Sequence, residues 1–152
     1  MRVLPCALLL MSSVLSAAQE KKGTWQRVYS GEDSIIEINV SKVTFVEYDV
    51  SRNATFSYNT GRVGFRTIFS KPEVLKEKPG VKYKSRLETI DFNCATNRYR
   101  SYETTLLDEK GKVIKTFGWD PSAEWKEAKH GGMMDKLSVA ACKLIDEKRR
   151  NQ

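Results

Sequence analysis

The residues of this 152-residue chain with the clearest chemistry are its cysteines, Cys6, Cys94 and Cys142. Cys6 lies in an N-terminal apolar segment with the features of an export signal, so an exported chain would retain only Cys94 and Cys142. Two thiols in an oxidising compartment usually pair. We therefore predict a Cys94–Cys142 disulfide, which removes about 4 kcal/mol of unfolded-state entropy. The alternative is two inert free thiols, because no CxxC motif or activating neighbour is present.

The first 18 residues have the three parts of a secretory signal peptide. A basic start at Arg2 precedes an apolar run from Val3 to Leu15, and the small residues Ser16, Ala17 and Ala18 follow. We expect cleavage after Ala18, which leaves one domain over residues 19–152 and lowers the formal charge from +7 to +6. A membrane anchor is the alternative, but it needs about 20 apolar residues, and this run is shorter. No later segment is apolar enough to span a membrane.

Catalytic and metal-binding constellations do not stand out. The chain has one histidine, His130, beside Gly131 and Gly132, and no neighbouring residue is placed to orient it as a general base. No His, Cys or carboxylate set has ligand spacing, and no nucleophile-elbow motif occurs. We therefore expect no enzymatic activity, metal or cofactor. An enzyme that uses dispersed carboxylates is the alternative that spacing alone leaves open.

Basic residues provide the stronger binding signal. Six of them lie between Lys71 and Arg86, against two glutamates. In a strand, Lys82, Lys84 and Arg86 would share one face, and Arg98 and Arg100 would share another. With Trp119, which follows a glycine in a turn, they form a candidate site for anions or protein partners. The alternative is a solvated sheet face or a lysine-protected edge strand. Nucleic acid is not an expected partner of an exported chain with modest charge.

The elements that would position these residues are short strands followed by one helix. Apolar residues alternate in Val63-x-Phe65-x-Thr67-x-Phe69, as in a half-buried strand, and the pattern changes phase near Glu88-Thr89, which predicts a β-bulge. Lys71-Pro72 is expected to end the strand, with a loop to Gly80. From Met133 the apolar period becomes helical. The sequence predicts an α+β fold, with a meander of about six antiparallel strands packed against a C-terminal helix and joined to it by one disulfide.

The order of these landmarks resembles the bacterial surface-adhesin protein E-like family across nearly all of residues 19–152. The resemblance rests on an early tryptophan, an Ile-acid segment that ends in serine, a strand that ends in Asp-x-x-Cys before an Arg-Tyr-Arg run, a Gly-Lys-Val hairpin, a Glu-Trp pair and a helix with the second cysteine. In this chain these are Trp25, Ile36–Ser41, Asp91–Cys94, Arg98–Arg100, Asp108–Val113, Glu124-Trp125 and Cys142. The chain departs from the family in having His130-Gly131-Gly132 before the helix and no lipobox.

The resemblance implies a sheet-plus-helix fold, dimerisation, and binding to host extracellular proteins such as vitronectin, laminin or plasminogen. Together with the basic residues, it makes an exported, non-enzymatic binding protein the leading hypothesis. Such a protein would be periplasmic or at the cell surface, and its ligands would be matrix proteins, anionic glycans or lipid headgroups. The second hypothesis is a periplasmic structural or envelope-maintenance protein with no host ligand.

Overall fold

A computed structural model describes residues 24–46, 59–118, 120 and 123–152. The predicted signal peptide of residues 1–18 and the candidate residue Trp119 lie outside these ranges. Within the described ranges, seven strands and one helix follow in chain order: β1 (Trp25–Ser30), β2 (Ser34–Phe45), β3 (Thr60–Val74), β4 (Lys82–Asn93), β5 (Arg98–Leu107), β6 (Val113–Phe117), β7 (Lys126–Glu127) and α2 (Met133–Arg150).

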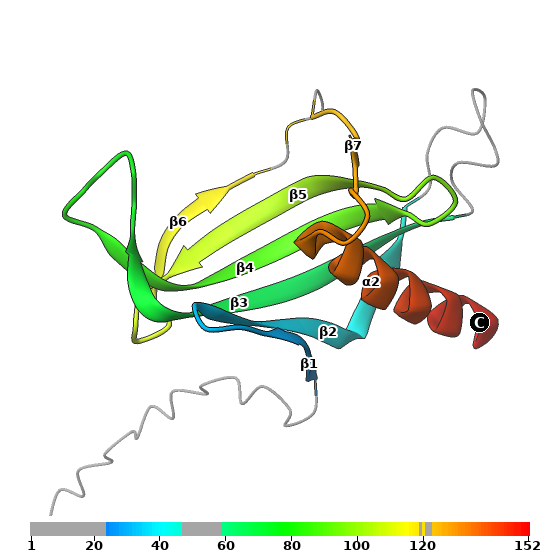
Figure 1. Cartoon of the computed structure of the whole chain (residues 1–152), viewed down its shortest axis with the longest axis horizontal. Helices are drawn as coiled ribbons and strands as arrows, with labels where there is room; N and C mark the ends of the chain where they lie inside the picture. Colours follow the sequence, from blue (N-terminus) through cyan, green and yellow to red (C-terminus); the bar gives the residue numbers. More distant parts are fainter. Residues whose placement is uncertain (1–23, 47–58, 119, 121–122) are drawn as a thin grey trace, which may run out of the picture.

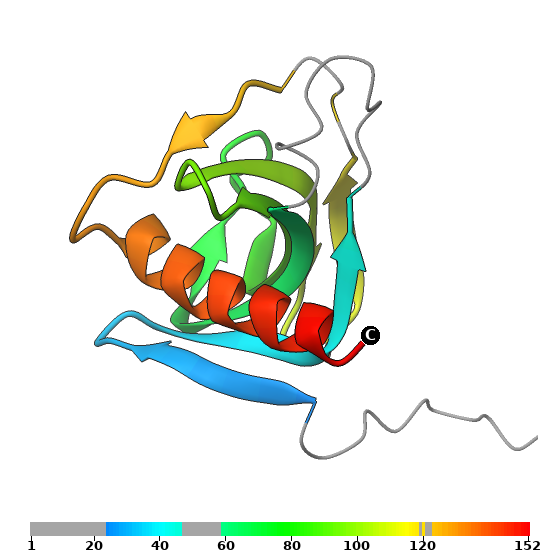
Figure 2. The same cartoon turned by 90° about the vertical axis from the view of Figure 1, so that its right-hand side faces the viewer.

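The strands form a single antiparallel sheet whose first six members follow chain order. Strand β7 pairs with Arg98 and Tyr99 at the beginning of β5, whereas β6 pairs with the end of β5. The sheet curves strongly, and α2 lies across one face of it, over β1 to β4 (Figures 1 and 2). The helix covers only the end of the sheet that contains the turn between β4 and β5. The long β3–β4 hairpin extends away from it (Figure 1).

The core lies between α2 and the sheet face that it covers. Alternating positions of β3 and β4 point toward the helix, and Phe65 packs edge-on against Phe92 at 5.9 Å between ring centroids. Both rings are buried. The helix contributes an apolar stripe at helical spacing. The buried members of this core are Ile36, Ile38, Val63, Phe65, Ile90, Phe92, Leu137, Ala141, Leu144 and Ile145.

A glycine lets the helix approach the sheet closely. A Cβ atom on Gly61 would lie 2.6 Å from the side chain of Ile145, closer than two carbon atoms can approach. Gly61 is the second residue of β3, and Ile145 is 1% exposed. The absence of a side chain at Gly61 therefore sets the depth to which the C-terminal half of α2 sinks into the sheet.

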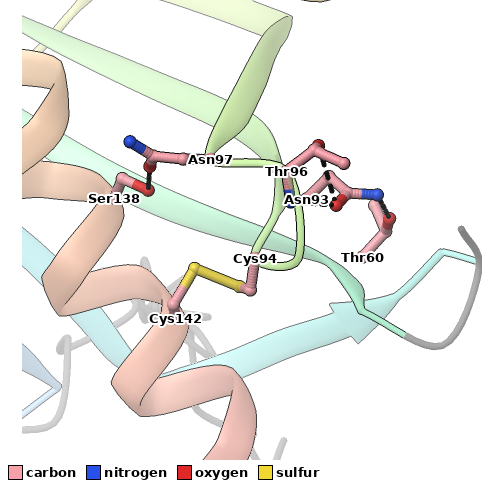
Figure 3. The surroundings of a disulfide bond; sticks show 7 residues. All are labelled: Thr60, Asn93, Cys94, Thr96, Asn97, Ser138 and Cys142. Carbon is pink, nitrogen blue, oxygen red and sulfur yellow. Dashed lines mark hydrogen bonds between the residues drawn. A yellow bond between two sulfur atoms is a disulfide. The ribbon is translucent and has the colours of Figure 1, made fainter. Parts of the chain in front are cut away.

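The predicted disulfide joins the end of β4 to α2, with Cα atoms 5.6 Å apart at Cys94 and Cys142 (Figure 3). Hydrogen bonds support it on either side. Ser138 donates to the side-chain oxygen of Asn97 at 2.8 Å, so the β4–β5 turn is held against the helix. Asn93 donates to Thr60 at 3.1 Å and accepts from the backbone of Thr96. The junction is therefore fixed covalently and by buried polar contacts.

The sequence-based predictions of fold class, strand order, terminal helix and disulfide are confirmed. The phase change near Glu88-Thr89 corresponds to a register shift between Thr89 and Ile90 in the β4–β5 pair. One boundary was wrong: β3 does not end at Lys71-Pro72 but continues to Val74. Pro72 is tolerated because it lies in an irregular part of the β3–β4 ladder, between Ile68 and Glu73, where proline removes no ladder hydrogen bond.

The helix begins without a side-chain cap at Gly132. Asp135 instead accepts a hydrogen bond from the backbone N–H of Gly131 at 2.9 Å, and this bond lowers the pKa of Asp135. Lys148, Arg149 and Arg150 occupy the last turn, where cations interact favourably with the helix dipole. Of the helices in the described ranges, none is long and apolar enough to cross a membrane.

The disulfide should contribute measurably to stability. We expect reduction, or the double substitution Cys94→Ser with Cys142→Ser, to lower the free energy of unfolding by about 2–4 kcal/mol, because the reduced unfolded chain regains loop entropy. Urea titration followed by circular dichroism, with and without reductant, measures the loss. The double variant is the control, because reductant should not change its midpoint. An unchanged wild-type midpoint under reducing conditions would contradict the prediction.

Candidate functional site

The candidate basic residues lie in two separate places on the sheet. Arg86 pairs with Leu106 near the end of β5, whereas Arg100 pairs with Asp91 near its beginning. Six residues of extended chain separate these positions by about 20 Å. The structure therefore does not unite Lys82, Lys84 and Arg86 with Arg98 and Arg100 in one surface.

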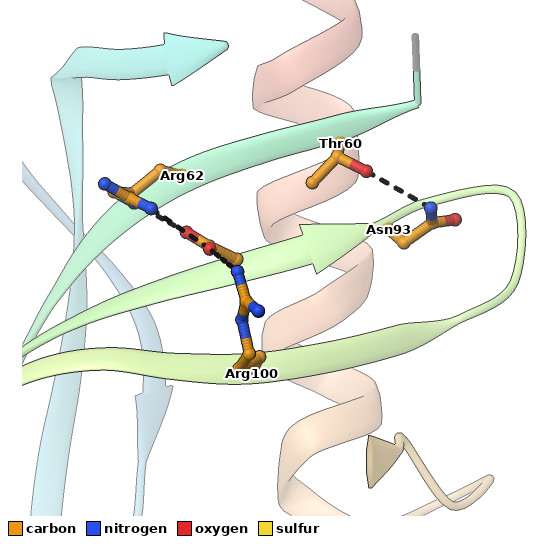
Figure 4. Close-up of polar contacts among 5 residues, drawn as sticks. Thr60, Arg62, Asn93 and Arg100 are labelled. Carbon is orange, nitrogen blue, oxygen red and sulfur yellow. Dashed lines mark hydrogen bonds and ion pairs between the residues drawn. The ribbon is translucent and has the colours of Figure 1, made fainter. Parts of the chain in front are cut away.

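Arg100 is part of the protein interior rather than of an accessible patch, which corrects the sequence-based expectation for this residue. Its side chain is 9% exposed and donates to Asp91, which is fully buried, at 3.1 Å. Arg62 on β3 contacts the same carboxylate through two hydrogen bonds, at 2.6 and 3.1 Å. Figure 4 shows the two arginines converging from β3 and β5, on either side of β4, on the sheet face away from α2. Arg98, at the start of β5, is exposed.

Arginines on this helix-free face also stack on aromatic rings. Arg62 lies 3.2 Å above the ring centroid of Tyr102, and Arg100 lies 5.0 Å from that of Trp125. Burial by itself would lower the pKa of Arg62, but its hydrogen bonds to Asp91 and the charge of that carboxylate raise it overall. Arg66 follows the same design, with Glu37 at 2.7 Å and the ring of Trp25 at 4.7 Å. These cations are neutralised within the fold.

The other group, on β4, lies at the hairpin end of the sheet. Lys82 is exposed. Lys84 donates to the backbone carbonyl of Ser70 at 2.8 Å, and Arg86 forms an ion pair with Glu88 at 3.0 Å. Of these three predicted contact residues, Lys84 and Arg86 therefore have their charges engaged within the protein, and Lys82 directs its charge to solvent. Lys76, in the hairpin loop, is also exposed.

A hollow opens beside these residues, on the part of the sheet face that α2 does not cover. Arg86, Leu106 and Phe117 share this face because paired residues of antiparallel strands point the same way. The apolar walls are accessible: Val74 is 46% exposed and Phe117 37% exposed. We call this the hairpin-end hollow. Its lining residues are Glu73, Val74, Leu75, Lys76, Glu77, Tyr83, Arg86, Thr104, Leu106 and Phe117.

The hairpin-end hollow combines apolar and cationic groups in the way that protein-binding surfaces do. An exposed aromatic ring at Phe117 beside an arginine matches the composition of binding hot spots. The segment from Lys71 to Arg86 has six basic and two acidic residues, a surplus of four positive charges. An acidic partner with an apolar side chain would suit it. The described residues include no cluster of three or more histidine, cysteine or carboxylate groups arranged to hold a metal.

Of the predicted contact residues on β4, only Arg86 lines the hairpin-end hollow, and sequence reasoning missed the apolar walls. Val74, Leu106 and Phe117 come from three different strands, and only the register of the sheet brings them together. A weak signal existed in Phe117, the apolar residue that ends β6 after the Gly-Lys-Val hairpin. Glu88 was also missed. Burial raises the pKa of this carboxyl group, and the neighbouring Arg86 only partly offsets the effect.

Comparisons with known proteins agree with this architecture. The family model for surface-adhesin protein E matches residues 25–143. Two solved structures are similar at 11% sequence identity. The structure of Haemophilus influenzae protein E has a TM-score of 0.56 and covers 84% of this chain and 90% of that chain. Protein E from non-typeable Haemophilus influenzae has a TM-score of 0.52, with 91% and 96% covered. The search of curated protein sequences finds no significant match.

The buried carboxylate of Asp91 should be essential for folding. Replacing it in Asp91→Asn leaves Arg100 buried without its countercharge, and we expect a loss of about 3–5 kcal/mol in the free energy of unfolding. The matched control is Glu37→Gln, which removes the more exposed pair with Arg66 and should cost clearly less. Chemical denaturation of both variants measures the difference. Equal losses would show that burial does not determine the strength of these pairs.

Glu88 should make stability depend on pH in a defined direction. Because its folded-state pKa is raised, the folded protein binds the proton more tightly than the unfolded chain does, so stability falls as the pH rises through and above the ordinary carboxyl range. Glu88→Gln removes this contribution. The variant should therefore gain stability relative to the wild type between about pH 3 and about pH 7. A difference that stays constant, or that changes in the other direction, would contradict the assignment.

Proposed function

The chain belongs to the surface-adhesin protein E family, and from this premise we propose that it is an exported, non-enzymatic binding protein whose hairpin-end hollow takes an acidic segment of a host extracellular-matrix protein. Family membership supports a surface, adhesin-like role at the coarse level. The observation that carries the finer proposal is the hairpin-end hollow itself. It is an apolar surface with accessible aromatic and aliphatic groups inside a region of surplus positive charge.

Each part of the hairpin-end hollow would have a separate role in binding. Long-range attraction from Lys76 and Lys82 would speed encounter with an acidic partner, and it would weaken as salt screens the charges. Affinity would come from burying Phe117 and Val74, which are already accessible and held by strands. Arg86, which lines the hollow and is paired with Glu88, would act mainly by shaping the wall. Lys84 lies outside the lining and is engaged with the backbone of Ser70.

A second candidate function has one observation in its favour. Arg62, Arg66 and Arg100 are all paired and stacked within the fold, so these three cations serve the structure itself. A periplasmic structural or envelope-maintenance protein without a host ligand would need no more than this. Protease treatment of intact cells separates the two: cleavage by external protease supports a surface binder, and full protection supports a periplasmic resident.

The hairpin-end hollow can be tested by reversing its solvent-directed charges. We expect Lys76→Glu with Lys82→Glu to lower the affinity for immobilised matrix proteins such as vitronectin and laminin about tenfold, the equivalent of about 1.4 kcal/mol. The wild-type affinity should fall with rising salt, and the affinity of the variant should fall less. Phe117→Ser should weaken binding at all salt concentrations. Surface-based binding assays measure each change.

The matched control is Lys136→Glu with Lys143→Glu, which alters the net charge by the same amount on the distant helix. It should leave matrix-protein binding unchanged. If both double variants lose binding equally, net charge rather than the hairpin-end hollow is responsible. If neither the wild type nor any variant binds matrix proteins, the adhesin proposal fails and the envelope function is favoured.

A further inference from the structure

The outward side of α2 has a row of cations unrelated to the hairpin-end hollow. Lys136, Lys143 and Arg150 are exposed and follow each other at intervals of seven residues. Two helical turns bring a side chain back to almost the same direction, so the three charges form a straight line with about 10.5 Å between neighbours. We call this line the helix crest. Figure 2 shows α2 with one side against the sheet. By helical spacing, the helix crest lies on the arc opposite the buried residues Leu137, Ala141 and Leu144.

An exposed apolar side chain lies beside the helix crest. Val139 is 68% exposed, the highest fraction among the large apolar residues that the structure describes. Met133, at the start of the same helix, is 37% exposed. Cations that flank accessible apolar side chains are the arrangement with which surface helices bind lipid headgroups and the adjacent acyl region.

The flank next to the helix crest is hollowed and has a partly apolar floor. Ile38 and Leu144 are buried at this floor, between α2 and β1, whereas Lys143 and Lys148 lie at its edge. A hollow of this kind can accept part of an acyl chain while the ammonium groups hold a phosphate. Its other lining residues are Gln26, Val28, Val40, Ala140, Glu147 and Asn151.

The acidic residues of the helix reduce this positive surface but do not cancel it. The helix from Met133 to Arg150 contains five basic and three acidic residues. Asp135 is engaged by the backbone of Gly131 and by Asn97, at the edge of the helix away from the helix crest. Asp146 and Glu147 remain beside it and would oppose an anionic ligand. The resulting surplus of two charges lies on a helix that the disulfide and the core already hold in place.

We propose that the helix crest of α2, with Val139 and the adjacent hollow, attaches the protein peripherally to an anionic lipid surface. A linear sulfated chain could also follow a row of cations, but it has no use for an exposed valine or a hollow with an apolar floor. This inference does not depend on the proposed function, because the helix crest and the hairpin-end hollow are separate surfaces. One protein could therefore attach to a membrane through α2 while its hairpin end stays available.

Co-sedimentation of the purified protein with phospholipid vesicles tests this inference. We expect binding to vesicles that contain phosphatidylglycerol, much weaker binding to pure phosphatidylcholine vesicles, and a decline with salt. Lys136→Glu with Lys143→Glu should lower the partition coefficient by at least about tenfold. Val139→Asn should weaken binding even at high salt, because it removes the apolar contact. Circular dichroism and melting curves establish that each variant is folded.

The control is Lys76→Glu with Lys82→Glu, which has the same change in charge at the hairpin end and should keep most of its vesicle binding. Equal loss in both double variants would overturn the proposal in favour of attraction by net charge alone. Binding to heparin but not to the anionic vesicles would overturn it in favour of a linear polyanion. Matrix-protein binding by the same variants tests the proposed function separately. A negative result in the vesicle assay therefore does not affect the conclusion from the matrix-protein assay, and the reverse also holds.

Discussion

The structure depends on how one short helix packs on a long, curved sheet. An α-helix of 18 residues is about 27 Å long, whereas a strand of 15 residues such as β3 extends about 50 Å. The helix is therefore long enough to cover only about half of the sheet face on which it packs. Gly61 lets Ile145 sink into that half, and the disulfide holds it there. The uncovered half is left to smaller contacts among strand side chains, and this is where the accessible Phe117 and Val74 are found.

The sheet face away from the helix is covered in a different way. No second layer of described secondary structure covers it, yet it includes the fully buried Asp91. Arginines supply the cover: each lies flat over an aromatic ring and directs its donors to a carboxylate on a neighbouring strand. A guanidinium group suits this role because it is planar, always charged and weakly hydrated. Arg62, Arg66 and Arg100, three of the 26 basic residues, therefore serve the fold itself.

This division explains what could be predicted from the sequence. Alternation of apolar residues, the change to a helical period at Met133 and the export context of Cys94 and Cys142 were sufficient for the fold class, because each is a local or pairwise signal. The site was harder. Lys82 and Arg100 look alike as basic residues on predicted strands, but one is exposed and the other is buried against Asp91. Cross-strand register decides between them, and no single strand contains that information.

The position of the disulfide also restricts the order of events during biogenesis. Cys142 follows Cys94 by 48 residues, and β5, β6 and β7 lie between them. A chain that emerges N-terminus first exposes the earlier thiol before its partner has emerged. For that interval Cys94 is open to mixed disulfides with other proteins or with thiol oxidases. Conditions under which such early linkages can be reversed until α2 has emerged therefore favour the Cys94–Cys142 pairing.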